Sequence, residues 1–373
     1  MKEKIEKIGK NKFILIGGFL VIILLILLGS AFIYHTFFYK MSFSEIESVM
    51  VDTAKKHMKK NENILPKNYN ETVSLSVNDL ARAEEMKDIK EYLKDDSISC
   101  TGNIIVTKIN DNYFRYTPNL DCGETYKTNK FIDYIKSKNP IVTNGNGLYE
   151  LNEELVFRGD NVNNYLQLSD KLYRIVKFSS NEAIIIYTDK TEATIWDDRY
   201  NLEKTSNVGI NNYDVSKIKD YLDNLYQGTT LLGIDKATGF NYKNLVVAYQ
   251  LNIGKRSSKD TDKSGKLEMS AVMENQFIGL LPLNDFINAS LDKDCTTSIS
   301  PSCQNYNYLS KFQNNWWTGT ATNLNSYNVY RIETSPKLVS ANSTAHIRPV
   351  LHLTRDALYV SGDGTKTNPY VIK

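Results

Sequence analysis

Residues 13–34 read FILIGGFLVIILLILLGSAFIY, and this stretch decides how the rest of the chain is interpreted. It carries no charged side chain and consists almost wholly of Leu, Ile, Val, Phe and Gly. At a rise of about 1.5 Å per residue, a helix of this length crosses a hydrocarbon core of about 30 Å. The sequence therefore predicts one transmembrane helix at residues 13–34, in contact with membrane lipid.

Two other interpretations of this stretch stay open. A cleaved signal peptide has a shorter apolar core, of about 7–15 residues, although Gly29-Ser30-Ala31 offers small residues for cleavage. A soluble core helix would need protein on every side of an unbroken apolar cylinder.

The lysines before this stretch set the expected orientation. They are Lys2, Lys4, Lys7, Lys10 and Lys12. Because Lys and Arg mark the cytoplasmic side, we expect a cytoplasmic tail at residues 1–12, a single pass of the cell membrane and an extracellular remainder. Glu3 and Glu6 dilute the tail, so no nucleic-acid partner is expected.

The remainder has the composition of a folded protein. Of the 373 residues of the whole chain 41% are hydrophobic and 11% aromatic, which is enough to bury cores in two domains. Ile46, Met50, Ala54 and Met58 recur at helical spacing, so the pattern predicts a helix over residues 42–60. A second helix is expected over residues 77–93, followed by two strands within residues 103–117.

Four cysteines form two local pairs. Cys100 and Cys122 flank the two predicted strands, while Cys295 and Cys303 flank a short polar loop. An even count outside the cell predicts disulfides between nearest neighbours, one of three possible connectivities. A metal site is disfavoured, because neither pair has C-x-x-C spacing and no histidine lies within either loop.

The first part of the exterior carries a resemblance. The helix, the Leu65-Pro66 turn, the second helix, C-x-G-x-I-x-V from Cys100 and the Asp121-Cys122-Gly123 end resemble a membrane-proximal module of Gram-positive surface proteins. Its outline is similar to a pilin-like head on an N-terminal helix. The resemblance implies a pilin-like α+β domain at residues 42–140, with a linker rich in Gly and Asn after it.

From residue 148 onward, short strands are expected, including residues 151–158, 172–178 and 183–188. Helices are expected at residues 215–225 and 282–287. FIGLLPLNDF, NNWWTGTATNLNSYNVYRI and HIRPVLHL resemble an extracellular domain family similar to the formylglycine-generating-enzyme and C-type-lectin-like folds. The resemblance implies a β-rich lectin-like domain at residues 148–373, so the predicted fold class is α+β with an N-terminal transmembrane helix.

Aromatic residues near the C-terminus are the first binding candidates. The candidate ligand-binding residues are Trp316, Trp317, Tyr327, Tyr330 and Arg348. Neighbouring residues of a strand point to opposite faces, so one tryptophan could lie in the core and the other could stack on a sugar or a protein partner. Two core tryptophans are the alternative.

A weak calcium candidate lies at Asp260, Asp262 and Ser264, which alternate as in the first half of a calcium loop. The glutamate expected at its twelfth position is replaced by Ala271, so a polar turn is favoured and no cofactor is expected. His346 and His352 would lie about 20 Å apart along one strand, too far to share a metal directly.

Catalytic motifs are sparse. A copper oxygenase of the formylglycine-generating type would need Cys295 and Cys303 as reactive thiols. Ser216 and Ser290 begin Ser-x-x-Lys runs without the companion motifs of penicillin-binding enzymes. The sequence therefore predicts a non-catalytic extracellular recognition or adhesion protein that binds a glycan or a protein. The alternatives are an assembly role for the pilin-like part and a degenerate formylglycine-generating-type enzyme.

Overall fold

The computed structural model describes residues 40–373 apart from residues 96, 112, 180–181, 229–230, 235–239 and 355. The predicted tail at residues 1–12 and the predicted transmembrane helix at residues 13–34 lie outside the described residues. Among the helices of the described part, none is long and apolar enough to cross a membrane. The predicted fold class is corrected accordingly: the described chain is a β-rich α+β protein, and a membrane-spanning helix is not among its elements.

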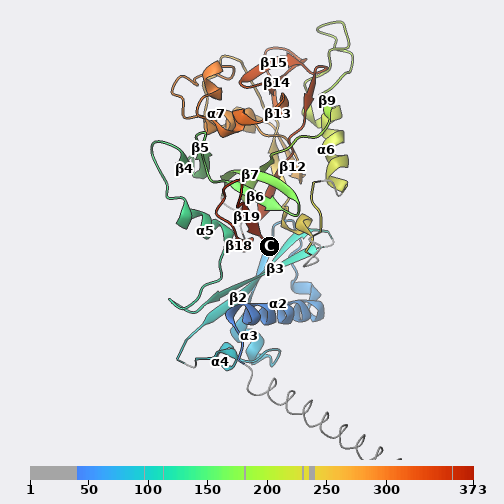
Figure 1. Cartoon of the computed structure of the whole chain (residues 1–373). Helices are drawn as coiled ribbons and strands as arrows, with labels where there is room; N and C mark the ends of the chain where they lie inside the picture. Colours follow the sequence, from blue (N-terminus) through green and yellow to red (C-terminus); the bar gives the residue numbers. More distant parts are fainter. Residues whose placement is uncertain are drawn as a thin grey trace, which may run out of the picture. The chain divides into compact units, whose positions relative to one another are not determined.

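The described chain forms two compact units (Figure 1). Unit 1 comprises Ser74–Ile104, Pro118–Lys127 and the described residues up to Glu62, and unit 2 comprises Asn63–Val73, Ile105–Thr117 and Thr128–Lys373. The domains predicted from the sequence, residues 42–140 and 148–373, are contiguous ranges and stay predictions.

Unit 1 is built on helix α2 (Phe43–Lys60). The Ser42 side chain accepts a hydrogen bond from the backbone of Glu45, and the Glu45 carboxylate accepts one from the backbone of Ser42, which forms a capping box. The stripe predicted from the sequence is buried, since Ile46, Met50 and Ala54 are all 0% exposed. The helix predicted over residues 42–60 is confirmed.

The second predicted helix is wrong as a single element. The structure has α3 (Val77–Arg82) and α4 (Ile89–Tyr92) instead. Glu84 adopts a left-handed backbone with φ of 58°, which ends the first helix, and Asp88 caps the second one.

A three-stranded sheet follows the order β1 (Thr72–Ser76), β2 (Thr101–Asn110) and β3 (Tyr113–Asp121). In unit 1, α2 approaches this sheet so closely that a Cβ on Gly102 would lie 3.1 Å from the Met50 side chain. The disulfide Cys100–Cys122 joins the outer ends of β2 and β3 with an S–S distance of 2.02 Å. The two predicted strands and this predicted pairing are confirmed.

Unit 2 contains most of the β-structure. Its helices are α5 (Phe131–Lys138), α6 (Lys217–Gln227) and α7 (Leu283–Ala289). The larger sheet contains β4 (Gly147–Leu151), β5 (Glu154–Arg158), β6 (Tyr165–Leu168), β7 (Lys171–Phe178), β8 (Glu182–Tyr187), β17 (Val350–Thr354), β18 (Tyr359–Ser361) and β19 (Tyr370–Ile372). Its order is β17-β8-β7-β6-β19-β18, and the β4–β5 hairpin joins through β7.

A second sheet contains β9 (Ala193–Ile195), β11 (Lys255–Arg256), β13 (Trp316–Thr322), β14 (Asn328–Ile332), β15 (Pro336–Ser340) and β16 (Thr344–His346). Its order is β15-β14-β13-β16-β9, with β11 paired to β13. Strands β10 (Tyr249–Asn252) and β12 (Val272–Gln276) form a separate pair.

One predicted strand of this unit needs correction. The sequence predicted a strand over residues 151–158, but the chain turns there, with Asn152 and Glu153 at φ of 50° and 67°. Two successive residues in the left-handed region are typical of the tight turn between hairpin strands, here β4 and β5. A second disulfide, Cys295–Cys303, lies in this unit and confirms the other predicted pairing. Two disulfides are typical of an extracellular or secreted protein.

Candidate functional site

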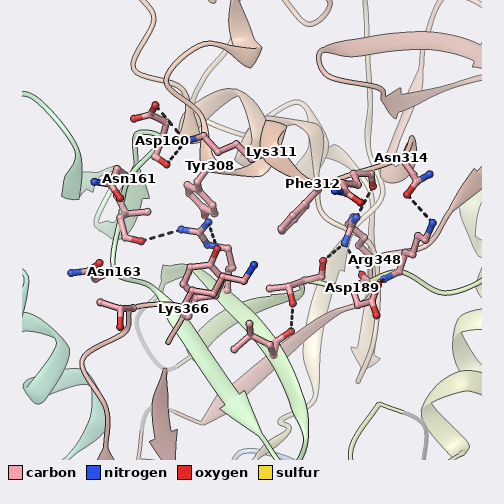
Figure 2. A pocket seen from close by; sticks show the side chains of 18 residues that line it. Asp160, Asn161, Asn163, Asp189, Tyr308, Lys311, Phe312, Asn314, Arg348 and Lys366 are labelled. Atoms are coloured by element: carbon pink, nitrogen blue, oxygen red, sulfur yellow. Dashed lines mark hydrogen bonds and ion pairs between the residues drawn. The ribbon is translucent and has the colours of Figure 1, made fainter. Parts of the chain in front are cut away.

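A cavity of about 720 Å³ opens in unit 2 where loops of both sheets meet (Figure 2). The larger sheet contributes the loop between β5 and β6, residues of β6 and β7, and the loops after β8 and before β19. The second sheet contributes the chain that enters β13 and the chain that leaves β16. The residues that line the cavity are Asp160, Asn161, Val162, Asn163, Tyr165, Leu172, Arg174, Thr188, Asp189, Lys190, Tyr308, Lys311, Phe312, Gln313, Asn314, Arg348, Thr365 and Lys366.

Arg174 lies on β7 and is only 5% exposed. Its guanidinium carbon lies 4.2 Å from the ring centre of Tyr165 and 4.4 Å from that of Tyr308. Its Nε donates to Oδ1 of Asn164 at 2.6 Å, and its Nη2 donates to the carbonyl of Val162 at 3.0 Å. A third bond runs from Nη1 to the Tyr165 hydroxyl. Nη1 and Nη2 each carry two hydrogens, so each keeps one N–H beyond these bonds.

Arg348 lies between β16 and β17 and is only 2% exposed. Its guanidinium carbon lies 4.3 Å from the ring centre of Phe312. Its Nη1 donates to the carbonyls of Thr188 and Asp189, and its Nη2 donates to the carbonyl of Gln313 at 2.8 Å. Nη2 therefore also keeps one N–H, and the buried Nε has no hydrogen-bond partner among the described residues.

Neither arginine forms an ion pair with a carboxylate of the described residues. Among the ion pairs of the described residues none involves Arg174 or Arg348, and their hydrogen bonds go to carbonyl, amide and hydroxyl oxygens. Burial lowers the pKa of Arg174, and burial lowers the pKa of Arg348 to about 10 although the Asp189 carboxylate acts in the opposite direction. Both groups stay charged at neutral pH.

The rim of the cavity adds three lysines. Nζ of Lys190 donates to Oδ1 of Asn314 at 2.7 Å, and Nζ of Lys311 donates to the carbonyl of Asp160 at 2.9 Å. Lys366 is exposed. With two arginines, three lysines and two aspartates in its lining, the cavity has three more positive than negative side chains.

Two further arginines show that carbonyl contacts alone do not define a site. Arg158 donates to the carbonyls of Asn288 and Ser290, and buried Arg115 donates to that of Asp356. Neither of them lines the cavity. The convergence of Arg174 and Arg348 on one open space is what distinguishes them.

The aromatic candidates from the sequence lie mostly in the core. Trp316, Trp317 and Tyr330 are each 0% exposed. Trp316 packs edge-on against Phe286, and the ring N–H of Trp317 donates to the carbonyl of Thr194 at 2.9 Å. These rings therefore have no surface to offer a ligand.

The other two candidates lie elsewhere. Tyr327 is partly exposed, and Nζ of Lys204 lies 5.5 Å from its ring centre. Arg348 lines the cavity, so the structure does not bring the five candidate residues together at one surface.

The metal candidates are engaged in local hydrogen bonds. Oδ2 of Asp260 accepts from the backbone of Ser257, and Oδ1 of Asp262 accepts from the backbone and hydroxyl of Ser264. Across the described part of the chain, no group of three or more His, Cys, Asp or Glu is placed to hold a metal ion.

The histidines and cysteines considered as metal or catalytic candidates also have partners within the protein. His346 bonds to the carbonyl of Thr191, while His352 bonds to Glu182 at 2.6 Å. Cys295 and Cys303 are joined in a disulfide, so neither is a free thiol.

Arg174 and the three lysines were missed by sequence reasoning. One signal was present: Arg174 interrupts the apolar run LYRIV, where a charge needs partners that the strand itself cannot supply. The lysines lie in loops far apart in sequence and gave no signal. The chain matches no family model, no curated protein and no solved structure.

Proposed function

We propose that this protein is a non-catalytic recognition protein of the extracellular side, and that unit 2 binds an acidic glycan in the cavity around Arg174 and Arg348. The observation that carries the proposal is the presence of two buried, charged guanidinium groups without a carboxylate partner in one cavity. Buried charges are normally paired, so a bound anion would supply what the folded chain lacks. Arginine forks suit carboxylate, sulfate and phosphate groups.

The shape of the cavity favours a glycan over a protein surface. A volume of about 720 Å³ falls within the usual range of small-ligand sites, whereas protein partners bind over roughly 800 Å² of mostly flat surface on each side. Four amide side chains and two threonine hydroxyls line the cavity, and they can both donate to and accept from sugar hydroxyls. The sequence resemblance to a lectin-like domain agrees with this choice.

Two further observations support recognition rather than catalysis outside the cell. The lining residues include no serine, cysteine or histidine, and the described cysteines are all oxidised to disulfides. Asp160 and Asp189 are the carboxylates that a glycan-cleaving enzyme could use. Their side chains are instead held locally, by Lys311 and by the backbone of Lys190.

The test is binding of the purified full chain to a panel of neutral, carboxylated, sulfated and phosphorylated glycans. We expect binding to acidic glycans only, and a loss of at least roughly tenfold in affinity for Arg348→Gln, because a charged hydrogen bond is removed. Arg82→Gln, which changes an exposed arginine of unit 1, is the matched control and should bind as wild type.

The other outcomes each point to another function. Equal binding of neutral and acidic glycans, or full binding by Arg348→Gln, would contradict the proposed site. Binding of acidic peptides without binding of any glycan would identify a protein ligand. Release of shortened glycan would indicate an enzyme that uses Asp160 or Asp189.

A further inference from the structure

The two arginines of the cavity are built into separate anchors. Arg174 is held by Tyr165, Tyr308, Asn164 and the carbonyl of Val162. The second anchor holds Arg348 through Phe312 and the carbonyls of Thr188, Asp189 and Gln313. Among the described residues, none is hydrogen-bonded to or stacked against both guanidinium groups, so the two positive charges are fixed independently.

Each anchor has one lysine and one aspartate beside it. Lys311 bonds to Asp160, at the start of the loop whose Val162 carbonyl holds Arg174. Lys190 follows Asp189, whose carbonyl holds Arg348. Figure 2 shows the same division: Asp160, Lys311 and Tyr308 lie toward one side of the view, and Asp189, Arg348 and Asn314 toward the other.

The charges at the two anchors are therefore alike. Each anchor combines one arginine, one lysine and one aspartate, which leaves one positive charge in excess, and Lys366 adds a further one to the lining. A ligand with a single acidic group can neutralise one anchor and leaves the other guanidinium buried without an anion. A ligand with two acidic groups can neutralise both.

Resting on the proposed function, we infer that the ligand is an oligosaccharide that carries two acidic groups, one for each anchor, as in a polymer with an acidic group in every repeat. The Nη1 and Nη2 hydrogens that remain on Arg174 meet one anion, and the remaining Nη2 hydrogen of Arg348 meets the other. Both carboxylates on sugar rings and phosphodiesters between sugars have the required charge and acceptor oxygens.

The experiment is calorimetric titration of the full chain with matched oligosaccharides of one length that carry no, one or two acidic groups. One series bears carboxylates and another bears phosphodiesters, which separates the two sources of charge. We expect the second acidic group to raise the affinity roughly tenfold or more. Raising the salt concentration should weaken binding of the doubly acidic ligand more steeply than binding of the singly acidic one.

Variants locate the two groups. Arg174→Gln and Arg348→Gln should each reduce the affinity for the doubly acidic ligand to about that for the singly acidic one. Lys311→Gln and Lys190→Gln change exposed side chains and should each lower the affinity for the doubly acidic ligand severalfold. Both variants should keep the fold, which circular dichroism and unfolding curves check. They decide the question if an arginine variant does not fold. Glu192→Gln changes an exposed side chain outside the cavity lining, and as the control it should bind both ligands as wild type does.

The outcomes separate this inference from the proposed function. Equal affinities for singly and doubly acidic ligands would overturn the inference and leave acidic-glycan recognition standing. An absence of binding to every acidic glycan would overturn both. A gain from the second acidic group that persists in Lys190→Gln, Lys311→Gln and both arginine variants would place the second group outside the cavity and would also overturn the inference.

Discussion

Strand β13 and the basic cavity are neighbours in unit 2, and they bury their side chains for opposite reasons. Every residue of β13 is buried, including Trp316 and Trp317, because both faces of the strand are covered by protein. The cavity buries arginines instead, and it holds them with backbone carbonyls and ring faces. Phe312 belongs to both regions, since its ring lies under Arg348 and packs edge-on at 6.1 Å from Trp316.

The difference teaches that burial alone does not tell a core from a site. In β13 the buried rings pack against apolar neighbours, and the buried hydroxyls of Thr318 and Thr320 donate to the carbonyl of Tyr330 and to Glu268, so partners within the protein satisfy them. A second buried arginine environment makes the same point, because Arg256 is 0% exposed and has Glu268 at 3.6 Å. Arg174 and Arg348 lack such a carboxylate and line an open space, which is why we assign them to a ligand.

The largest expected effect is a loss of folding stability when a buried ring of β13 is removed. Trp317→Ala removes a fully buried ring and its hydrogen bond to Thr194, and should lower the free energy of unfolding by about 3–5 kcal/mol. Urea denaturation followed by circular dichroism measures it. Tyr327→Ala, at a partly exposed position, is the control and should cost less than about 1 kcal/mol. A loss below about 1 kcal/mol for Trp317→Ala would show that the ring is not part of the core.

The next effect is a pH dependence of stability at Glu268, the carboxylate beside buried Arg256. Burial raises the pKa of Glu268 to about 7 from an ordinary value of 4.5. Between pH 4.5 and about 7 the unfolded chain releases the Glu268 proton before the folded one does, so the folded state loses stability as the pH rises through this window. Well below pH 4.5 the carboxyl group is neutral in both states and adds no such cost.

Glu268→Gln removes this titration but keeps a group that can bond to Thr320. The difference in unfolding free energy between variant and wild type should therefore change by up to about 3 kcal/mol across the window, in favour of the variant at higher pH. Denaturation at several pH values measures it. A flat difference for Glu268→Gln across the same pH values would mean that Arg256 keeps Glu268 ionised throughout.

The smallest expected loss follows removal of the second disulfide. Cys295→Ala with Cys303→Ala opens a loop with a sequence separation of 8, and should cost about 2.5 kcal/mol. Cys303 precedes the short helix Tyr308–Lys311, which carries residues of the cavity wall. Backbone hydrogen exchange should therefore rise in this helix while β13 stays protected. Equal loosening of both segments would show that the wall and the strand unfold as one element.

Local patterns predicted several elements correctly. The stripe at Ile46, Met50 and Ala54 was enough to place α2, because helix periodicity is a property of the nearby sequence. Sequence distance and compartment were enough to pair the cysteines. The break at Glu84 and the turn at Asn152 were missed, since a residue other than glycine in the left-handed region leaves little trace in the sequence.

The candidate site was predicted only in part. Alternation along a strand suggested that one tryptophan of Trp316 and Trp317 faces outward, but alternation fails where both faces of a sheet are covered. Arg348 was named from the sequence, whereas its partner Arg174 was not. The cavity depends on loops that tertiary structure brings together, and single-sequence patterns do not encode such proximity.

The contacts of Arg348 have a consequence for how this cavity could change in evolution. Its guanidinium holds the backbone at residues 188 and 189 to the backbone at residue 313, and thus joins two loops of the cavity wall. Replacing it would alter the charge and the shape of the cavity in one step. The side chains of the exposed lysines at 190 and 311 each bond to one residue of another loop, Asn314 and Asp160 respectively, whereas Arg348 bonds to three residues. A shift in ligand preference would therefore be accessible through the rim while the arginines stay fixed.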